Sequence, residues 1–261
     1  MKPSKNSKQS DVAVTVIMAS FNCAQFLEEA VESVRSQSFT NWELIISDDA
    51  STDDTAILLP KLQASDSRIR YVSSSVNQGA AKARNAALSE AKGRYIAFLD
   101  SDDLWKPQKL EKQIDFMQKH GVAFSFSSYE RIDEVGRSKG LVRAPPSVDY
   151  RQLLFGNVVG CLTAVYDTSV LGRVEMPDIA MRQDYGLWLR LLKKTSCAVS
   201  LDESLGFYRL RPTSMSARKL KAARFTWRLL HEFEQLPIPA AAFYFVNYAM
   251  RGIWSHYGPR Q

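Results

Sequence analysis

The chain has 261 residues, enough for one large α/β domain, and 45% of them are apolar, which excludes an intrinsically disordered protein. No apolar run reaches the ~18–20 residues that a membrane-spanning helix needs. The first eleven residues are basic and polar with no apolar stretch behind them, so we expect a flexible tail at 1–11 and not a secretory signal. The three cysteines are widely spaced, which indicates neither a disulfide framework nor a zinc site.

The positive charge of the chain is concentrated in its C-terminal part. The net charge is +6, and from Leu205 onward nine Lys and Arg residues stand against two Glu, so this part alone carries +7. Such an asymmetry points to an anionic partner or to a basic, solvated surface. No nucleic-acid recognition motif accompanies it, so we do not expect nucleic acid as the partner.

Predicted strands and helices alternate through the first 128 residues. Short runs rich in β-branched residues predict strands, and apolar residues at helical spacing predict helices. The strands are expected at 12–19, 42–49, 69–75, 95–100 and 122–128, and the helices at 24–37, 54–64, 80–93 and 106–121. This alternation indicates βαβ units and a mostly parallel sheet.

The pattern changes after residue 129. The helix expected at 184–194 carries Leu187, Trp188 and Leu191 on one face, which should anchor it to the core. The other elements expected in this part are a loop or hairpin at 131–147, a strand at 161–166, a short strand running into a polar loop over 205–216, and helices at about 217–235 and 239–257.

Polar clusters follow three of the predicted strands: SFNCAQ at 20–25, SDDASTDD at 47–54 and DSDD at 100–103. Ligands of parallel α/β sheets bind outside the carboxyl ends of the strands, so these clusters should converge on one site. Carboxylates as close as those of DSDD repel one another unless a positive group lies between them. Mg²⁺ and Mn²⁺, held by one or two carboxylates and by substrate phosphates, fit this pattern and predict a nucleotide site.

Each acidic cluster also has a purely structural explanation. Asp102 or Asp103 can cap a helix that begins near Lys106, and Asp48 or Asp49 can cap the helix that follows them. A solvated loop is a further alternative for the D-x-D segment. The occurrence of both clusters at one edge of the sheet favours a polyphosphate or nucleotide site.

The motifs of a known family run through residues 12–128, first in VTVIMASFNCAQFLEEAVESVRSQSFTNWELIISDDASTDDT and then in NQGAAKARNAALSEAKGRYIAFLDSDDLWKP. They closely resemble the nucleotide-sugar-binding half of the family-2 glycosyltransferases, which have the GT-A fold, and a looser match continues through RQDYGLWLRLL and YRLRPTSMS. The resemblance implies an α/β fold with a Rossmann-like, mostly parallel sheet, flanking helices and additional C-terminal helices. It divides the chain into the tail at 1–11, the nucleotide-sugar-binding half at 12–128, an acceptor and catalytic half of the same domain at 129–216, and a helical extension at 217–261.

The resemblance also implies roles for individual residues. Those that match nucleotide-binding positions are Ala19, Phe21, Asp49, Arg84, Asp100 and Ser101. Among them, Ala19 and Phe21 should line the pocket for uracil or another pyrimidine, and Asp49 should accept a hydrogen bond from the base. Asp102 matches the ligand of an Mg²⁺ or Mn²⁺ ion that bridges a nucleoside diphosphate, whereas Asp103 should start the next helix.

Asp184 matches the catalytic base of the family. An inverting transfer needs a carboxylate that takes the proton of the acceptor hydroxyl, and the positive end of a helix would keep it ionised. The family often has Glu-Asp where this chain has Gln183-Asp184, and capping of the helix is the alternative role of Asp184. Arg209 and Arg211 match a segment that closes over the diphosphate, and their donors suit phosphate oxygens. Ordinary surface arginines are the alternative.

The implied function is that of an inverting, metal-dependent glycosyltransferase. It would move a sugar from a nucleoside-diphosphate sugar, expected to be a UDP-sugar, to a hydroxyl of a growing, lipid-linked surface glycan. We expect it in the cytoplasm, peripheral on the inner membrane, with basic, aromatic C-terminal helices that bind anionic lipid or pack on the catalytic domain. A non-catalytic nucleotide-sugar-binding or scaffold protein of the same fold is the alternative, and the presence of Asp49, Asp102 and Asp184 argues against it.

Overall fold

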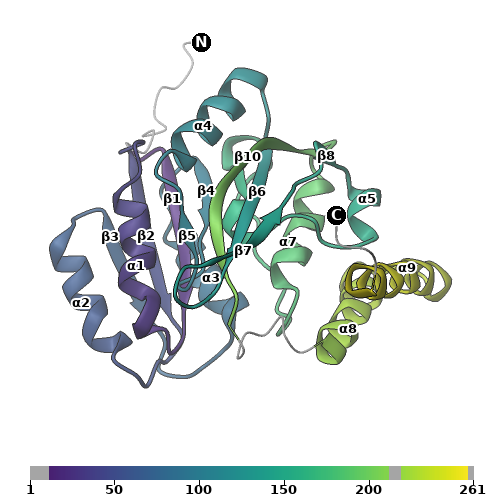
Figure 1. Ribbon diagram of the computed structural model, residues 1–261, viewed down its shortest axis with the longest axis horizontal. Coiled ribbons are helices and arrows are strands. Elements are labelled where there is room, and N and C mark those ends of the chain that lie inside the picture. The colour runs from purple at the N-terminus through teal and green to yellow at the C-terminus, as the bar shows by residue number, and fades with distance from the viewer. Residues whose placement is uncertain (1–11, 212–218, 258–261) are drawn as a thin grey trace, which may run out of the picture.

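The computed structural model describes residues 12–211 and 219–257, which form one sheet with helices on both of its faces (Figure 1). The expected tail at 1–11 and the last residues of the expected polar loop, 212–216, lie outside these ranges. The strands of the described chain are β1 (Val14–Ser20), β2 (Trp42–Asp48), β3 (Ile69–Ser73), β4 (Tyr95–Phe98), β5 (Leu104–Trp105), β6 (Phe124–Ile132), β7 (Ser138–Val142), β8 (Ser147–Val148), β9 (Val165–Asp167) and β10 (Ala198–Arg209).

The helices lie between these strands and at the C-terminal end. They are α1 (Ala24–Arg35), α2 (Thr55–Ser65), α3 (Ala80–Ser89), α4 (Lys109–His120), α5 (Tyr150–Leu154), α6 (Thr168–Leu171), α7 (Gln183–Leu192), α8 (Lys219–Arg228) and α9 (Ile238–Tyr257). A 3₁₀ helix covers Cys161–Thr163, and a π-helical turn covers Leu229–Phe233.

The strand order is β3-β2-β1-β4-β9-β6-β10-β5, with β7 paired to β6 and β8 paired to β10. The pairs β3–β2, β2–β1 and β1–β4 are parallel, which confirms the predicted βαβ alternation. In chain order, β2 and β3 are added on one side of β1, and β4 is then added on its other side. The crevice between the carboxyl ends of β1 and β4 is therefore the switch point at which such sheets bind ligands.

The second half of the chain extends the same sheet. β9 runs antiparallel between β4 and β6, and β10 runs parallel to β6. β10 has 12 residues and begins at Ala198, so the strand predicted at 205 is its last part. The predicted hairpin at 131–147 is confirmed as the turn between β6 and β7.

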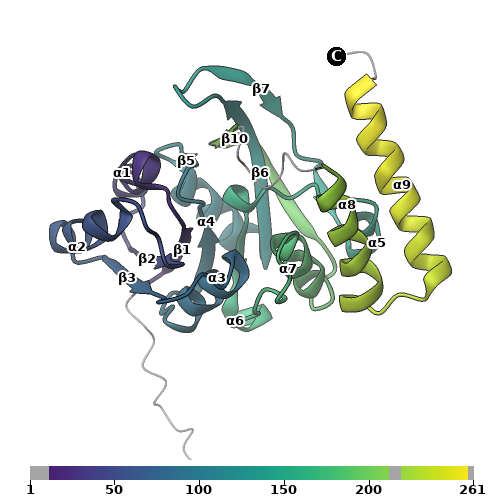
Figure 2. The ribbon, with the colours of Figure 1, turned by 90° about the horizontal axis from the view of Figure 1, so that it is seen from below.

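Alternate residues of the central strands contribute to two separate cores. Ile17 and Phe98 pack with α3 and α7 on one face of the sheet, whereas Val16 and Met18 pack with α1, α2 and α4 on the other. Figure 2 shows α1 and α3 on opposite sides of the sheet. Because successive residues of a strand point to opposite faces, a strand buried on both sides reads as the continuous apolar run seen in the sequence.

Two predicted elements are shorter than expected. α3 ends at Ser89 and not at 93, because Gly93 comes so close to β1 that a Cβ atom there would lie 2.4 Å from the backbone nitrogen of Thr15. The strand predicted at 161–166 is reduced to β9, since Thr163 turns back and donates its backbone N–H to the carbonyl of Gly160 at 2.9 Å.

α8 and α9 form a helical hairpin at one end of the molecule, with α9 outermost (Figure 2). The two helices and the break between them were predicted. Glu234 fixes the hairpin to the domain, because its carboxylate accepts a hydrogen bond from the hydroxyl of Tyr150 at 2.6 Å and pairs with Lys193 at 2.7 Å. None of the helices in the described ranges is long and apolar enough to cross a membrane.

Candidate active site at the carboxyl edge of the sheet

The loops that follow β1 and β2 are hydrogen-bonded to each other at this edge. Asn22, with φ 48°, donates its backbone N–H to Oγ of Ser51 at 2.9 Å, and its side-chain oxygen accepts the N–H of Thr52 at 2.8 Å. Oδ2 of Asp53 accepts the N–H of Ala24 at 3.0 Å. These bonds fix the chain as it turns from β1 into α1.

Ala19 and Phe21 flank the last residue of β1, beside the switch point. Ala19 is partly exposed, and 48% of Phe21 is exposed. A large aromatic side chain is seldom left this open, and its face is suited to stacking on a planar ligand. The structure thus brings both residues to the edge where the base was expected.

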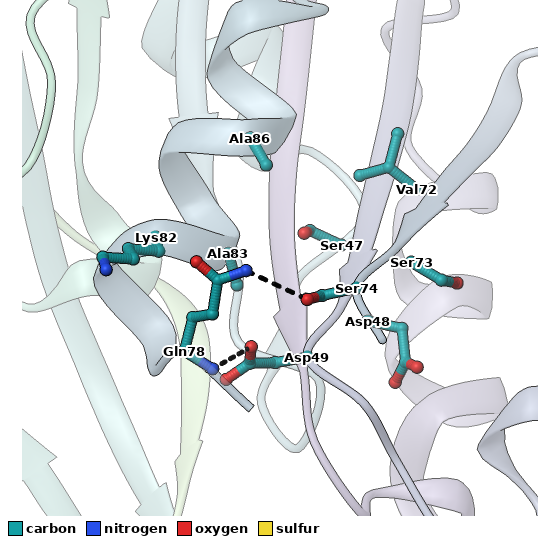
Figure 3. A pocket seen from close by; sticks show the side chains of 10 residues that line it. All are labelled: Ser47, Asp48, Asp49, Val72, Ser73, Ser74, Gln78, Lys82, Ala83 and Ala86. Carbon is teal, nitrogen blue, oxygen red and sulfur yellow. Dashed lines mark hydrogen bonds between the residues drawn. The ribbon is translucent and has the colours of Figure 1, made fainter. Parts of the chain in front are cut away.

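Asp49 is buried just after β2 and organises the approach to α3. Its carboxylate accepts hydrogen bonds from the backbone N–H groups of Gln78 at 2.8 Å (Figure 3) and of Gly79 at 2.7 Å. Asp49 therefore does not cap α2, the helix that follows it, whereas Asp48 accepts the N–H of Ser51 at 3.2 Å and closes the turn. A carboxylate has about four acceptor sites, so Asp49 keeps acceptor capacity beyond these two bonds.

A hollow of about 150 Å³ lies between α3 and the ends of β2 and β3. Its lining is mostly polar or small: Ser47, Asp48, Asp49, Val72, Ser73, Ser74, Gln78, Lys82, Ala83 and Ala86 (Figure 3). Asp49 forms part of its wall, so the hollow adjoins the position expected for the base. It is smaller than the ~300–1,000 Å³ of ligand pockets, and a nucleoside diphosphate would extend beyond it.

Two carboxylates of the D-x-D segment are paired with arginines from distant parts of the chain. Asp100 forms an ion pair with Arg84 of α3, whose side chain is only 7% exposed. Oδ2 of Asp102 lies 3.0 Å from Nη1 of Arg211, just after β10. Each of these acids is thus next to a positive group, as their mutual repulsion requires.

Arg84 is the buried positive charge of the site. Burial alone would lower the pKa of its guanidinium, but the charge and hydrogen bond of Asp100, together with the charge of Asp184, outweigh burial and raise that pKa. Its Nε and Nη1 atoms have no hydrogen-bond partner within the described residues. Arg84 therefore stays charged beside both Asp100 and Asp184, and two of its nitrogens are buried without a partner among the described residues.

Asp103 does not start a helix, contrary to expectation. It is 1% exposed, and its Oδ1 accepts the backbone N–H of Arg209 at 2.8 Å, which ties the acidic loop to β10. The short strand Leu104–Trp105 follows, and α4 begins only at Lys109. Pairing of this strand with β10 takes the residues that the first turn of the expected helix would have used.

Arg209 is a structural residue, and the expected contact of its side chain with a diphosphate is not supported. The side chain is 2% exposed and donates to the carbonyls of Asp102 at 2.9 Å and Glu134 at 3.0 Å and to the carboxylate of Glu29 at 2.7 Å. Arg211, whose side chain is 24% exposed, is the arginine that reaches the acids.

The acids fit a hard divalent cation. Burial and the charge of Asp100 raise the pKa of Asp102, while the bond with Arg211 acts to lower it. No group of three or more His, Cys, Asp or Glu residues that could hold a metal is found in the ranges the structure describes. Asp102 and Asp100 thus offer part of a coordination shell, which is the usual arrangement where substrate phosphates supply other ligands of Mg²⁺ or Mn²⁺.

Asp184 lies in the first turn of α7, which is held in the core by a fully buried face of Leu187, Trp188 and Leu191, as predicted. Burial raises the pKa of Asp184, although the N–H of Tyr185 and the charge of Arg84 act to lower it. The end of the helix was expected to keep the carboxylate ionised, but burial is the stronger effect. It makes Asp184 a stronger base than an exposed aspartate.

Two contacts beside Asp184 were missed by the sequence analysis. Nδ2 of Asn157 donates to Oδ2 of Asp184 at 3.2 Å, and Oδ1 of Asn157 accepts the N–H of Val159 at 3.0 Å. Arg182, in the left-handed region at φ 69°, donates from Nη2 to the hydroxyl of Tyr248 on α9 at 2.6 Å. Asn157 lies in an irregular segment without periodicity, where the only signal is a polar residue in FGNVVG.

A switch point lined by acids that are paired with arginines, in a sheet of this strand order, is the arrangement of an α/β enzyme that binds its ligand at the carboxyl ends of the strands. The chain belongs to glycosyl transferase family 2, whose sequence profile matches residues 15–168, and it is a glycosyltransferase. The family that the motifs resembled is thereby confirmed.

Two relatives match nearly the whole chain. The glycosyltransferase TuaG of Bacillus subtilis is 44% identical over 241 residues, which cover 92% of this chain and 96% of TuaG. WfgD of Escherichia coli, named UDP-Glc:alpha-D-GlcNAc-diphosphoundecaprenol beta-1,3-glucosyltransferase, is 38% identical over 247 residues, which cover 94% of this chain and 96% of WfgD.

Solved structures share the fold. TarS 1–349 of S. aureus, in complex with UDP-GlcNAc, has a TM-score of 0.72 at 18% identity and covers 91% of this chain and 72% of its own. The mannosyltransferase PcManGT from Pyrobaculum calidifontis, in complex with GDP-Man and Mn²⁺, has a TM-score of 0.67 at 17% identity. The match covers 99% of this chain and 80% of PcManGT. The α/β fold expected from the sequence, of the GT-A type, is confirmed.

Proposed function

We propose that the protein is an inverting glycosyltransferase in which Asp184 is the general base. The observation that carries this assignment is a buried carboxylate at the start of α7, beside Arg84, which in turn pairs with the acidic loop after β4. Asp184 takes the proton of an acceptor hydroxyl while the acceptor oxygen forms a bond to the anomeric carbon. The bond from that carbon to the diphosphate oxygen breaks on the opposite side, so the configuration inverts.

The donor binds at the switch point between β1 and β4. Phe21 and Ala19 contact the base, and Asp49 accepts a hydrogen bond from its ring N–H with the capacity left by its two backbone donors. Asp100 and Ser101 lie at the ribose. The name of WfgD, which contains UDP-Glc, supports a UDP-sugar as the donor.

The diphosphate is bound between the acidic loop and the arginines. Arg211 turns its donors to phosphate oxygens, and Arg84 adds a buried positive charge beside Asp100. Asp102, with Asp100, would hold an Mg²⁺ or Mn²⁺ ion. When bound, this ion neutralises the charge that develops on the departing diphosphate.

The acceptor is a lipid-linked precursor of a surface glycan. The name of WfgD supports this proposal, since it contains an acceptor joined to diphosphoundecaprenol. Residues 12–128 then bind the nucleotide sugar, 129–216 contribute the base and the acceptor side, and 217–261 form the helical extension. Such an acceptor places the enzyme in the cytoplasm, peripheral on the inner membrane.

A hydrolysis screen tests the donor, the metal and the activity together. UDP-, GDP- and dTDP-sugars are incubated with Mg²⁺, Mn²⁺ or EDTA, and release of the free nucleoside diphosphate is measured. We expect a UDP-sugar to release UDP. This release should require the metal and should be lost in Asp102→Asn. Release from a GDP- or dTDP-sugar alone would overturn the UDP assignment, and no release or binding in any condition would favour the non-catalytic alternative.

A further inference from the structure

α9 leaves a row of apolar side chains open to solvent. Phe243, Val246 and Met250 are 57%, 52% and 53% exposed, and their spacing of three and four residues places them on one face of the helix. We call these three residues the α9 stripe. From Gln235 to Met250 the sequence has no charged residue, so nothing within this part of α9 interrupts the stripe.

The opposite face of α9 contacts the segments that flank the candidate base. The hydroxyl of Tyr248 accepts a hydrogen bond from Arg182, two residues before Asp184 in the sequence. A Cβ atom on Gly156 would lie 3.7 Å from the ring of Tyr248, and the next residue, Asn157, donates to Asp184. α9 is therefore a direct neighbour of the acceptor side of the site, and it is the outermost helix at this end of the molecule (Figure 2).

The helical hairpin that carries the stripe is basic in sequence. In the hairpin from Lys219 to Tyr257 five Lys and Arg residues stand against two Glu. Both acids are already paired, Glu232 with Arg228 at 2.9 Å and Glu234 with Lys193 at 2.7 Å. The hairpin thus combines an apolar stripe with an excess of positive charge, which is the composition of helices that lie in the headgroup region of anionic bilayers.

We propose that the α9 stripe binds the surface of an anionic lipid bilayer and so holds the acceptor side of the site against the membrane. This inference rests on the proposed function, because only an acceptor anchored in the membrane gives such contact a purpose. A second copy of the chain is a poorer occupant. It would bring two basic hairpins together, and three side chains are a small fraction of the ~1,200–2,000 Å² that a stable interface buries.

The test compares vesicle binding of paired double variants. Val246→Ser with Met250→Ser removes apolar surface from the stripe without changing charge. Ile57→Ser with Val170→Ser is the matched control, because these residues are 58% and 63% exposed on α2 and α6. Co-sedimentation uses vesicles of phosphatidylethanolamine and phosphatidylglycerol, and vesicles of phosphatidylcholine, at low and high salt.

We expect the wild type and the control to bind the anionic vesicles. The stripe variant should bind them about tenfold more weakly at both salt concentrations, because it lacks two apolar side chains that would be partly buried in the bilayer. Phosphatidylcholine vesicles should bind the wild type less. Equal binding of the stripe variant and the control, or no binding of the wild type, would overturn the proposal, as would a dimer in light scattering that only the stripe variant loses. UDP affinity, measured by calorimetry, should be unchanged in both variants, so a failure here is distinct from a failure of the donor site.

Discussion

Nη1 of Arg211 lies 3.0 Å from Oδ2 of Asp102, so the arginine assigned to the diphosphate holds the carboxylate assigned to the metal. A cation and the guanidinium compete for this one carboxylate. Arg211→Gln should therefore have two effects of opposite sign. Mn²⁺ alone should bind more tightly because Asp102 is released, whereas UDP with Mn²⁺ should bind about ten- to a hundredfold more weakly, because a charged hydrogen bond worth ~1.5–3 kcal/mol is lost.

Paramagnetic resonance of free Mn²⁺ and calorimetry of UDP measure these two affinities separately. Arg228→Gln is the matched control, since Arg228 is a partly exposed arginine of α8 paired with Glu232. It should change neither affinity. If both affinities fall together in Arg211→Gln, the two residues support each other and do not compete.

Asp103 is predicted to act on stability through one hydrogen bond, to the backbone N–H of Arg209. Asp103→Asn keeps an acceptor at Oδ1, whereas Asp103→Ala leaves the N–H buried without a partner. The alanine variant should lose about 1–3 kcal/mol of unfolding free energy, and the asparagine variant much less. Urea unfolding followed by circular dichroism measures both. An equal loss in the two variants would mean that the bond is not the cause.

The central sheet could be predicted because its signals are local in sequence. The run that contains Val16 and Ile17 is short, apolar and β-branched, and every second residue enters the same core. The helices α1 and α7 likewise carry their buried faces at regular spacing. The family motifs added proposed roles for Asp102 and Asp184, which no periodicity contains.

The partners of the acids could not be predicted, because they depend on contacts between distant segments. Arg211 is 109 residues from Asp102, and nothing in either segment signals the other. Arg209 and Arg211 look alike in the sequence, yet one is buried in a network of carbonyls and the other faces the acids. Asp103 was assigned to a helix because local capping preferences do not report that β10 passes beside it.

Lys109 is expected to destabilise the protein at neutral pH. It is fully buried, its Nζ has no hydrogen-bond partner in the described chain, and it lies 4.0 Å from the centre of the Trp105 ring. Burial lowers the pKa of Lys109 well below its ordinary value of 10.5, so the folded state binds this proton less readily than the unfolded chain. Lys109→Met should therefore raise the unfolding free energy at pH 7 by about 1 kcal/mol and the Tm by roughly 2–4 °C.

The pH dependence of this gain has a definite sign. At neutral pH the unfolded chain keeps the lysine protonated, whereas the fold disfavours the proton, so stability rises with pH in this range. The gain from Lys109→Met should then shrink as the pH approaches 10.5, where the unfolded lysine also loses its proton. Lys112→Met, at a partly exposed position of the same helix that pairs with Glu203, is the control. A gain independent of pH would point to packing as its cause.

Asn157 should act as a positioning residue for the base. Its amide donates to Oδ2 of Asp184, which favours the ionised carboxylate. Asn157→Ala should raise the pKa of Asp184, so the acidic limb of the kcat/KM profile should move to higher pH while UDP affinity stays the same. Asn247→Ala, which removes an exposed amide of α9, is the control. A profile of unchanged shape with a uniformly lower rate would assign Asn157 a structural role only.

The sharpest prediction concerns Asp184 itself. Asp184→Asn keeps the size of the side chain and an oxygen that can accept a hydrogen bond, but it removes the basicity. A general base contributes ~10²–10⁴-fold in rate, so turnover should fall by about that factor while UDP affinity and the Tm stay near those of the wild type. Burial raises the pKa of Asp184, so the wild-type rate should still rise with pH above the pH range in which an exposed aspartate titrates. This rise of the rate with pH should be absent in the variant. Asp178→Asn, at a 70% exposed carboxylate paired with Lys82, should change none of these quantities. A variant that binds UDP and turns over at the wild-type rate would place the base elsewhere, and one that unfolds at lower temperature would show that Asp184 stabilises the first turn of α7.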